Sequence, residues 1–423
     1  MNAGDQSPKP PRVLIVEELL RDRQGHIGNF VLSIAEYLAE RGAAVKVWGH
    51  RDALPDLLPA PIKFERVFTH VWVELVYLPK RSARVAGVLV HNLRFLAVLA
   101  RNGAIFRPPP LVIAASANLY QFLAWRIWLA LTPRRSRLVL ILFQQPWLTQ
   151  TEATGRMRLR ESARVYRRVL RWFGDPVRSG RCCIAGETEL HARLISLLAG
   201  LRCVVVPIPL PAELLRVRAP QSSRPPGSPL RFGALGRAAA DKGFGCLLDM
   251  IERWHSTLAV RFVIQWEEHP SSPAEWKERV FALVRTRPGL VELVGKGQSV
   301  ADYANLVASL DGLLLPYRLA DYVGRLSNLA IDAFCVGVPI VCTAGSGIEE
   351  AMRRWGAGVV CRDQDADSLA DAVERLARDH EALAARAAER AVAARREHGC
   401  EHFFAQVAPG GLEQATRGRP PGG

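Results

Sequence analysis

The feature that most constrains the fold is an alternation of short apolar segments with helical segments, which runs through the chain twice. Continuous apolar runs are typical of strands in a parallel sheet that is covered on both faces. A strand, a helix and a second strand within about 35 residues imply parallel pairing through a right-handed crossover. The expected strands lie at 12–16, 44–48, 111–115, 138–143, 181–185 and 203–207, and then at 230–235, 260–265, 291–294, 312–316, 339–342 and 358–361. The alternation therefore predicts two α/β domains, each with a doubly wound parallel sheet.

A segment rich in proline, glycine and serine divides the two alternating regions. We interpret this segment, 211–229, as an interdomain linker, because its composition does not favour a regular element. We expect an N-terminal domain at 12–210 and a C-terminal domain at 230–385. We then expect a terminal helix at 386–408 that returns to the first domain, and a disordered tail at 409–423. Ligands of open parallel sheets lie outside the carboxyl ends of the strands, so we expect both sheets to face a central cleft.

Composition narrows the class of protein and its partners. The chain has 423 residues, a formal net charge of +15 and 49% hydrophobic residues, which is typical of a globular protein with two or three domains. The basic balance favours anionic partners, but no nucleic-acid-binding module is recognisable. The N-terminal segment lacks an apolar core, and no uncharged apolar run reaches about 18 residues, so we expect a cytoplasmic protein. The eight cysteines form no CxxC pair, which argues against a zinc site.

The sharpest local signal follows the first strand of the second domain. Gly236, Arg237, Lys242 and Gly243 frame a loop that connects this strand to a helix. The backbone N–H groups and the positive dipole end of the helix join the two cations there, and such an environment suits a diphosphate. The alternative is a solvated basic loop. The spacing differs from that of a P-loop.

A second polar loop, within 317–332, again leads from a strand into a helix. Ser327 is a suitable N-cap, which would leave the amides of Asn328 and Leu329 free to meet an anion. Asp332 follows about one turn later on the same side, where its carboxylate could accept hydrogen bonds from the vicinal hydroxyls of a ribose. The alternative is that Asp332 only complements the helix dipole.

A third loop follows the first strand of the chain and contains Gly25, His26, Gly28 and Asn29. Its two glycines would allow the backbone to approach a ligand closely. The loop lacks the GxGxxG pattern, and the second strand runs into Gly49, His50 and Arg51 with no acidic residue at its end. A nicotinamide cofactor is therefore disfavoured.

Two helical stretches of the first domain, 81–101 and 119–137, combine arginine with leucine or tryptophan. Both fit a helix that lies on an anionic membrane surface, and both also fit an ordinary helix that faces a protein core. Asp365 and Asp367 resemble a DxD metal motif, but their place just before the terminal helix favours N-capping.

With these motifs, the chain resembles the retaining family-4 glycosyltransferases of the GT-B fold, the glycosyl transferases group 1. The resemblance covers nearly all of 12–402 and is strongest at 231–377. The loop framed by Gly236 and Gly243 matches the family's G-R-x4-K-G element. Further matches lie at the end of a family strand and in the second half of the E-x7-E segment, at Pro316, Tyr317, Asp332, Ala333, Gly337 and Pro339.

The resemblance implies two Rossmann-like domains that face a central cleft. It also implies transfer of a hexosyl group from a nucleotide diphosphate sugar to a glycan or lipid-linked acceptor in bacterial polysaccharide synthesis. Neither cofactor nor metal is implied, because Arg237 and Lys242 would act as the catalytic groups that neutralise the leaving diphosphate. Donor binding would fall to Gly236, Tyr317, Arg325, Ser327, Asn328, Leu329 and Asp332, and the acceptor side to Gly25, His26, Gly28, Asn29 and Gln145. A peripheral position on the inner face of the cytoplasmic membrane is one option for such an enzyme.

Two positions depart from the family pattern. Gly324 stands where the family has the first Glu of E-x7-E, which usually contacts the donor sugar, and Gln145 stands where a histidine is common. These departures leave open a second hypothesis, a degenerate GT-B protein that binds a sugar nucleotide or glycan without transfer. A GT-B epimerase is a further alternative, although the G-R-x4-K-G element resembles the transferases.

Overall fold

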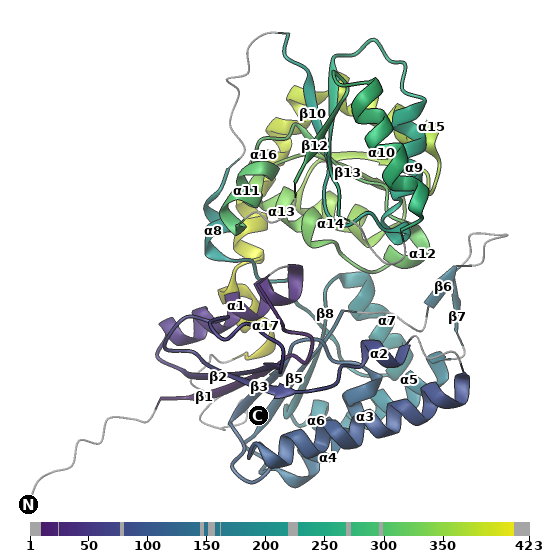
Figure 1. The fold of residues 1–423 in the computed structure, drawn as a ribbon. Coiled ribbons are helices and arrows are strands. Elements are labelled where there is room, and N and C mark those ends of the chain that lie inside the picture. The colour runs from purple at the N-terminus through teal and green to yellow at the C-terminus, as the bar shows by residue number, and fades with distance from the viewer. Residues whose placement is uncertain are drawn as a thin grey trace, which may run out of the picture. The chain divides into compact units, whose positions relative to one another are not determined.

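The computed structural model describes residues 10–23, 25–76, 80–143, 148–150, 157–160, 162–218, 227–267, 272–295 and 299–409. Contacts divide the chain into two compact units (Figure 1). Unit 1 comprises Met1–Trp147, Leu159–Pro211 and Cys400–Gly423, and unit 2 comprises Leu148–Arg158 and Ala212–Gly399. A two-stranded sheet of β6 (Leu148–Gln150) and β7 (Met157–Leu159) lies outside the two main sheets.

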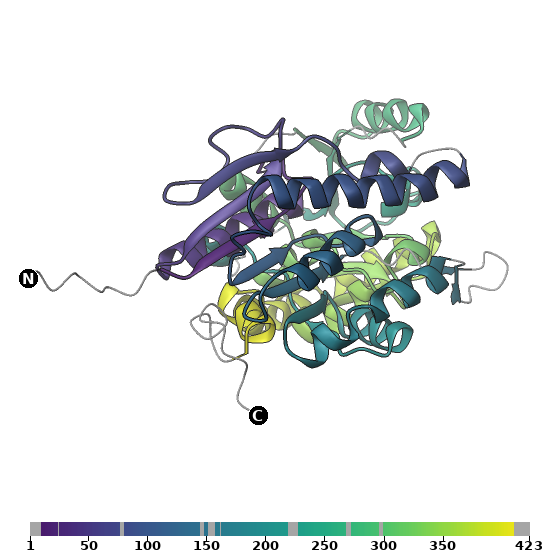
Figure 2. The same cartoon turned by 90° about the horizontal axis from the view of Figure 1, so that it is seen from below.

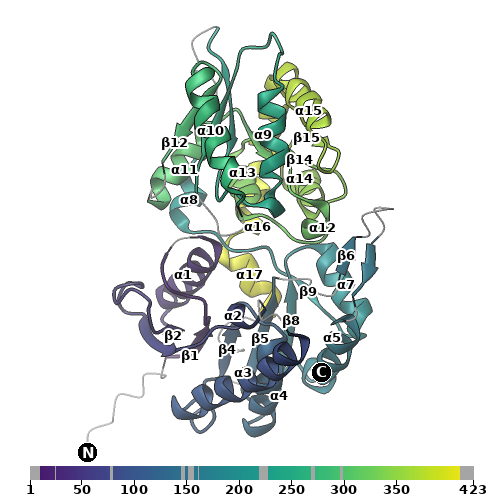
Figure 3. The ribbon, with the colours of Figure 1, turned by 45° about the vertical axis from the view of Figure 1, so that its right-hand side comes forward.

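Unit 1 is built on a seven-stranded parallel sheet of order β3-β2-β1-β4-β5-β8-β9 (Figure 3). Its strands are β1 (Arg12–Val16), β2 (Ala44–His50), β3 (Lys63–Phe68), β4 (Leu111–Ala114), β5 (Arg137–Leu142), β8 (Cys182–Gly186) and β9 (Val204–Val205). The central strands are buried, as the continuous apolar runs predict. The sequence analysis missed β3, because half of the residues of this edge strand are charged and only its last residue is buried.

The helices of unit 1 cover both faces of its sheet. The chain moves in opposite directions along the sheet after β1 and after β4, so right-handed crossovers place α1 (Gly25–Glu40) and α4 (Leu119–Leu131) on opposite faces. Short α17 (Cys400–Val407) contacts α1. On the other face, neighbouring helices pack side by side; they are α3 (Arg81–Arg101), α4, α5 (Ser162–Arg171) and α7 (Glu189–Ala199), with the short α2 (Val73–Val76) and α6 (Gly174–Arg178) beside them.

Unit 2 has a six-stranded parallel sheet of order β12-β11-β10-β13-β14-β15. Its strands are β10 (Leu230–Ala234), β11 (Val260–Gln265), β12 (Val291–Val294), β13 (Gly312–Leu315), β14 (Ile340–Thr343) and β15 (Gly358–Cys361), each close to its predicted range. The surrounding helices are α8 (Ala212–Arg216), α9 (Phe244–Glu252), α10 (Ala274–Thr286), α11 (Val300–Ala308), α12 (Leu319–Tyr322), α13 (Asn328–Val336), α14 (Gly347–Trp355), α15 (Ala366–Arg378) and α16 (His380–Glu397), with a 3-10 turn, η1, at Ala240–Lys242. Each unit is thus a doubly wound α/β domain, as expected.

The ends of the units differ from the expected boundaries. The linker expected at 211–229 begins with the helix α8, and residues 219–226 lie outside the described residues. The terminal segment expected at 386–408 is shared, since α16 belongs to unit 2 and α17 to unit 1. Small residues let α16 pack closely on α13, where a Cβ on Gly337 would lie 3.2 Å from Ala388 Cα. The tail expected to be disordered from 409 lies outside the described residues from 410 onward.

The alanine-rich helix α16 is followed by α17, which packs on unit 1 through two phenylalanines. Phe403 of α17 is fully buried, and its ring centroid lies 5.7 Å from that of Phe30 in α1. Phe404 stacks on Tyr37 of the same helix at 5.2 Å. Packing on α1 removes these large apolar rings from water, and their burial holds α17 on unit 1.

Candidate functional site

The strand order of unit 2 brings the two predicted donor loops together. β10 and β13 are neighbours at the centre of the sheet, and the chain leaves them in opposite directions, toward β11 and toward β14. The loops that follow such strands diverge and leave a binding position at the carboxyl edge. The loop after β10 contains Arg237 and Lys242, and the loop after β13 contains Tyr317 and Arg325. A hydrogen bond of 3.0 Å from the Arg318 amide to the Asp241 carbonyl joins the two loops.

Two glycines lie at the ends of the first loop, and a different close contact excludes a side chain at each of them. Gly236 has a φ of +92°, and a Cβ there would lie 2.9 Å from Lys242 Nζ. Gly243 has a φ of +66°, and a Cβ there would lie 1.9 Å from the Pro316 carbonyl oxygen. The Gly236 amide donates to Gln265 Oε1 at 2.7 Å, which fixes the start of the loop. The G-R-x4-K-G spacing therefore reflects close packing against the second loop as well as left-handed backbone.

Lys242 lies in a strongly positive environment. Its half-buried ammonium is 5.8 Å from the centroid of the Tyr317 ring. Burial lowers the pKa of Lys242, and the charges of Arg237 and Arg325 lower it further, against the opposing effect of Asp241 and Glu267. The three cations therefore repel one another in the unliganded protein. An anion bound among them would relieve this repulsion.

Aromatic side chains support the second loop. Tyr317 and Tyr322 are buried, with ring centroids 4.6 Å apart, and the Arg325 guanidinium lies 4.8 Å from the Tyr322 centroid. The Thr343 hydroxyl donates to the Tyr317 carbonyl at 2.6 Å. The structure therefore holds Arg325 beside Lys242 through packing that the motif alone did not indicate.

The first turn of α13 begins where the sequence predicts, but it lacks the predicted side-chain cap. Ser327 is the N-cap residue, but its hydroxyl makes no capping hydrogen bond to the first turn and instead lies 3.5 Å from the Tyr317 hydroxyl. Asp332 is 6% exposed and hydrogen-bonds with Tyr303 of α11. Burial raises the pKa of Asp332 to about 8, although the Tyr303 hydrogen bond opposes this shift. Most Asp332 side chains are therefore protonated at neutral pH in the unliganded protein.

The start of α14 fixes the backbone at Gly324 and Arg325. A Cβ on Gly347, at the start of α14, would lie 2.6 Å from the Arg325 carbonyl oxygen. Ser346 caps α14 by accepting from the Glu349 amide at 3.2 Å. The segment 345–350 thus shapes the loop on which Gly324 and Arg325 lie.

The predicted acceptor loop is described in part. The sequence analysis expected a loop through Gly28, but the structure places Gly25, His26, Gly28 and Asn29 in the first turns of α1. Gly28 is needed there because a Cβ would lie 2.6 Å from the Asp22 carbonyl oxygen, so its role is close packing. The side chain of His26 lies outside the described part of the chain, as does Gln145.

Two buried carboxylates of unit 1 were missed by the sequence analysis. Glu17 and Glu18 follow β1 directly, where the strand order of unit 1 reverses between β1 and β4, and each is 1% exposed. Burial raises the pKa of Glu17 to about 7, partly opposed by a hydrogen bond with Ser116, which follows β4. Glu18 lies 2.9 Å from His91 Nε2 and accepts from the Gln121 side chain. The signal in the sequence is a pair of acids placed directly after a central apolar strand.

The structure distinguishes between the remaining alternatives of the sequence analysis. Asp365 caps α15 by accepting from the Ser368 amide at 2.8 Å, which confirms the N-capping interpretation. The large apolar side chains of the stretch 119–137 are at most 1% exposed; they are Phe122, Trp125, Trp128 and Leu129. They cannot contact a membrane, so the membrane interpretation of α4 is wrong. No group of three or more potential metal ligands is found among the described residues.

Helix α3 runs along the outside of unit 1 (Figures 1 and 2). It differs from α4, because much of its apolar surface is exposed. Val85, Leu89 and Leu93 repeat every four residues and are 65%, 53% and 53% exposed, while His91, Phe95 and Leu99 of the opposite face are buried. By length and composition, Ser82–Arg101 is the one described helical segment that could cross a membrane. Its buried face shows that it packs on unit 1 along one side.

Comparisons with known proteins identify the class of fold. Residues 229–379 match the family model for glycosyl transferases group 1. A search of the curated proteins finds no match. Among solved structures, sucrose-phosphate synthase from Thermosynechococcus elongatus has a TM-score of 0.65 at 16% identity, covering 93% of this chain and 96% of that one. The Anabaena protein HepE, in complex with UDP-glucose, has a TM-score of 0.60 at 14% identity, with 94% and 98% covered.

A third solved structure, described as trehalose-6-phosphate from E. coli bound with UDP-2-fluoro glucose, has a TM-score of 0.63 at 12% identity, covering 97% of this chain and all of that one. The chain therefore has the GT-B fold, with two parallel-sheet α/β domains. The family match falls on unit 2, over both loops of the candidate site. Together these findings support a GT-B glycosyltransferase.

Proposed function

We propose that this protein is a metal-independent, retaining glycosyltransferase that moves a hexosyl group from a nucleotide diphosphate sugar. The observation that carries the proposal is the convergence of Arg237, Lys242 and Arg325 at the strand-order reversal of unit 2. The match to glycosyl transferases group 1 covers these residues and supports the same chemistry. Two structures of similar fold are complexes with UDP-glucose and UDP-2-fluoro glucose, which supports a nucleotide sugar as donor.

Catalysis would depend on stabilising the leaving diphosphate. Arg237 and Lys242 neutralise the charge that develops on its oxygens, and the first-turn amides at Asn328 and Leu329 donate to it. The leaving group takes the proton of the acceptor hydroxyl, so no further base is required. Asp332 accepts hydrogen bonds from the ribose hydroxyls, for which its ionised form is the better acceptor. No metal or other cofactor enters this scheme.

The acceptor would bind to unit 1, near the first turn of α1. We assign it as a glycan or a lipid-linked glycan of bacterial polysaccharide synthesis, as the family resemblance implies. Glu17 and Glu18 are buried at the carboxyl edge of the sheet, where their hydrogen bonds with Ser116 and Gln121 would fix the backbone on the acceptor side.

Membrane association is part of this proposal. The exposed apolar side chains of α3 are flanked by Arg94 and Arg101, which are also exposed. An apolar strip with cations at its border suits the surface of an anionic bilayer. We therefore propose a cytoplasmic enzyme that binds peripherally to the inner face of the cytoplasmic membrane.

The donor site can be tested with Arg237→Ala and Lys242→Ala. Arg285→Ala is a matched control, because Arg285 is an exposed arginine of α10 in the same unit. Thermal shifts with UDP-, GDP-, ADP- and TDP-sugars would first identify the donor. We then expect donor hydrolysis to fall by roughly a hundredfold or more in both site variants and to be unchanged in the control. Full donor binding and turnover in both site variants would contradict the proposal.

A second candidate function is binding without transfer. It is favoured by Gly324, which is buried and carries no side chain where the family has a donor-contacting glutamate. Calorimetric binding of a sugar nucleotide, with no turnover on any acceptor and no donor hydrolysis, would favour this candidate over the enzyme.

A further inference from the structure

The serine at the start of α13 behaves differently from the serines that begin two other helices of unit 2. Ser299 caps α11 by accepting from the Asp302 amide at 3.1 Å, and Ser346 caps α14. Ser327, like Ser346, has an extended N-cap backbone, with a φ of −108° and a ψ of 130°. Its side chain nevertheless accepts from no amide of the first turn. Neither the residue type nor the backbone conformation therefore explains the missing cap.

The missing cap leaves amides of the first turn open. The hydrogen-bond ladder of α13 begins with the Ile331 amide, which donates to the Ser327 carbonyl at 3.1 Å. The three amides before it, at Asn328, Leu329 and Ala330, have no partner in the part of the chain that the structure describes. A serine cap would occupy the amide of Leu329 or Ala330 and would turn the lone pairs of its oxygen toward an incoming phosphate. The open amides therefore suit the diphosphate of the proposed donor.

Tyr317 provides the alternative partner for the serine hydroxyl. The Ser327 hydroxyl donates to the Tyr317 hydroxyl oxygen at 3.5 Å, and both side chains are buried. Burial raises the pKa of Tyr317 to about 12, and the hydrogen bond with Ser327 opposes this shift. The bond is long, but it is the one hydrogen bond of the Ser327 side chain among the described residues, and a buried hydroxyl favours a partner over none.

The position of Tyr317 does not depend on Ser327. The Thr343 hydroxyl donates to the Tyr317 carbonyl at 2.6 Å, and the Tyr322 ring packs on the Tyr317 ring at 4.6 Å between centroids. Burial raises the pKa of Tyr303, and the nearby Asp332 and Tyr317 raise it further, so these three groups lie close together. Tyr317 is thus fixed by the loop and the core around it, and the serine side chain orients toward it.

We infer that Tyr317 is a positioning residue for donor binding, which holds the Ser327 hydroxyl away from the end of α13 and so keeps the first-turn amides open. The inference rests on the proposed function, because it takes the donor diphosphate to bind at this helix end. Tyr317 acts through Ser327 rather than by contact with the donor. Without the tyrosine hydroxyl, Ser327 turns to the helix end, caps α13 and competes with the diphosphate.

The test compares Tyr317→Phe, Ser327→Ala and the double variant in the full-length chain. Calorimetry at neutral pH measures the Kd of UDP, GDP, ADP and TDP, and the tightest of the four is the probe for all variants. We expect Tyr317→Phe to weaken binding roughly tenfold, because the serine then occupies an amide that a phosphate oxygen needs. In that background, Ser327→Ala should recover most of the loss, whereas in the parent it should not strengthen binding. A merely structural role of Tyr317 would not make binding stronger when a second hydroxyl is removed.

Thermal unfolding provides a second measurement, with Ser299→Ala as the matched control. Ser299→Ala removes a serine cap and should lower the unfolding midpoint by roughly 2–4 °C. Ser327→Ala removes no cap in the parent and should lower the midpoint by less than half as much. In the Tyr317→Phe background it removes the new cap, and the loss should then approach that of the control. If Ser327→Ala lowers the midpoint of the parent as much as Ser299→Ala does, the serine already caps α13 and the inference is wrong.

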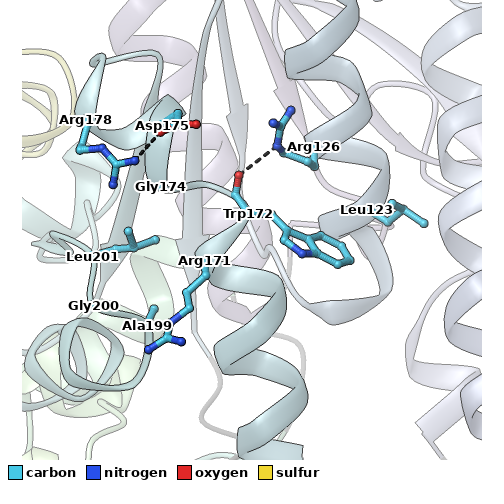
Figure 4. A pocket seen from close by; sticks show the side chains of 10 residues that line it. All are labelled: Leu123, Arg126, Arg171, Trp172, Gly174, Asp175, Arg178, Ala199, Gly200 and Leu201. Atoms are coloured by element: carbon cyan, nitrogen blue, oxygen red, sulfur yellow. Dashed lines mark hydrogen bonds and ion pairs between the residues drawn. The ribbon is translucent and has the colours of Figure 1, made fainter.

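A group of arginines in unit 1 provides the control for anion binding elsewhere. A cavity of about 620 Å³ lies at the amino edge of the sheet, where residues 171–178 and 199–201 come just before β8 and β9 (Figure 4). Arg126, Arg171 and Arg178 line it, but their guanidinium groups point away from one another and do not converge on one diphosphate. Arg171→Ala should therefore leave the Kd of the probe unchanged. A loss as large as that of Tyr317→Phe would place the diphosphate in unit 1 and overturn the inference.

The outcomes separate this inference from the proposed function. If Arg237→Ala weakens binding but Ser327→Ala does not strengthen it in the Tyr317→Phe background, the inference is overturned and the donor site stands. The same holds if Tyr317→Phe binds the probe as tightly as the parent. If the parent binds none of the four nucleoside diphosphates, both the donor site and the inference fail.

Discussion

At the scale of single residues, the candidate site contains side chains whose charged forms are unfavourable when no ligand is bound. Lys242 lies between Arg237 and Arg325, and Asp332 is a buried carboxyl whose pKa is raised to about 8. Gly243 adopts a left-handed conformation against Pro316, in which a residue with a Cβ would be strained. Functional sites often concentrate such unfavourable features, because the bound ligand and the surrounding fold compensate for them.

Gly243→Ala should destabilise unit 2 by more than about 2 kcal/mol, because the new Cβ meets the Pro316 carbonyl and the φ of +66° disfavours alanine. Gly289→Ala is the control, since a Cβ there meets nothing within 4 Å. Its effect should stay within about 1 kcal/mol. Denaturant unfolding measures both. Equal stability of the two variants would contradict the assigned role of Gly243.

Asp332→Asn should change how stability depends on pH. The pKa of Asp332 is about 8 in the folded protein, against 3.8 as its ordinary value, so the folded state holds this proton more tightly. Its contribution to stability therefore falls as pH rises between these values, and the variant lacks that loss. Relative to the parent, Asp332→Asn should gain on the order of a few kcal/mol in unfolding free energy from about pH 5 to about pH 9. A difference that does not vary with pH would argue against the raised pKa.

At the scale of elements, α3 and α4 show how one kind of sequence can serve two purposes. Both helices combine arginine with large apolar residues, and both fitted a membrane surface or a core. The large side chains of α4 are buried between the sheet and neighbouring helices, whereas three turns of α3 present Val85, Leu89 and Leu93 to solvent. The difference lies in how much of each helix the neighbouring elements cover, and this is not encoded within the helix itself.

Substitutions of apolar residues in the two helices should therefore differ in their effect on the free energy of unfolding. Leu129→Ala in α4 should cost about 2–5 kcal/mol of unfolding free energy, because Leu129 is 1% exposed. Leu93→Ser in α3 should change stability by no more than about 1 kcal/mol, because Leu93 is 53% exposed. Chemical denaturation checks both values. A large loss of stability in Leu93→Ser would mean that the exposed strip is part of a packed core.

At the scale of the whole molecule, the first and the last described elements, β1 and α17, belong to the same unit. The contribution of α17 to unit 1 comes from Phe403 and Phe404, which contact Phe30 and Tyr37 of α1. The helix α16 that precedes them is part of unit 2. The end of the chain thus stabilises the helix whose first turn carries the proposed acceptor loop.

Phe403→Ala should destabilise unit 1 by about 3–5 kcal/mol, since the side chain is fully buried. Hydrogen exchange should become faster in α1 and stay unchanged in α13 of unit 2. Val392→Ala, in the exposed part of α16, is the control and should leave both regions as in the parent. Faster exchange in α13 but not in α1 would contradict the assignment of α17 to unit 1.

The sequence by itself determined the buried strands and the position of the donor loops. Apolar runs marked the buried strands because a parallel sheet covered on both faces has no polar side, and the G-R-x4-K-G spacing marked a loop between a strand and a helix. These are local signals, and Arg237, Lys242 and Asp332 were found in this way. The same reading missed Glu17, Glu18, Gln265 and Tyr303, whose importance comes from burial and from partners that are distant in sequence.

Only the tertiary structure decided which loops meet and which apolar surfaces stay exposed. The neighbouring positions of β10 and β13 bring Lys242 to Tyr317 and Arg325, and the order of these strands is set by packing across the whole sheet. Packing likewise buried the tryptophans of α4, left α3 half uncovered and placed three arginines around a cavity at the amino edge of unit 1. The physical reason is that burial and charge proximity depend on all neighbours of a residue, while a sequence motif records only those along the chain.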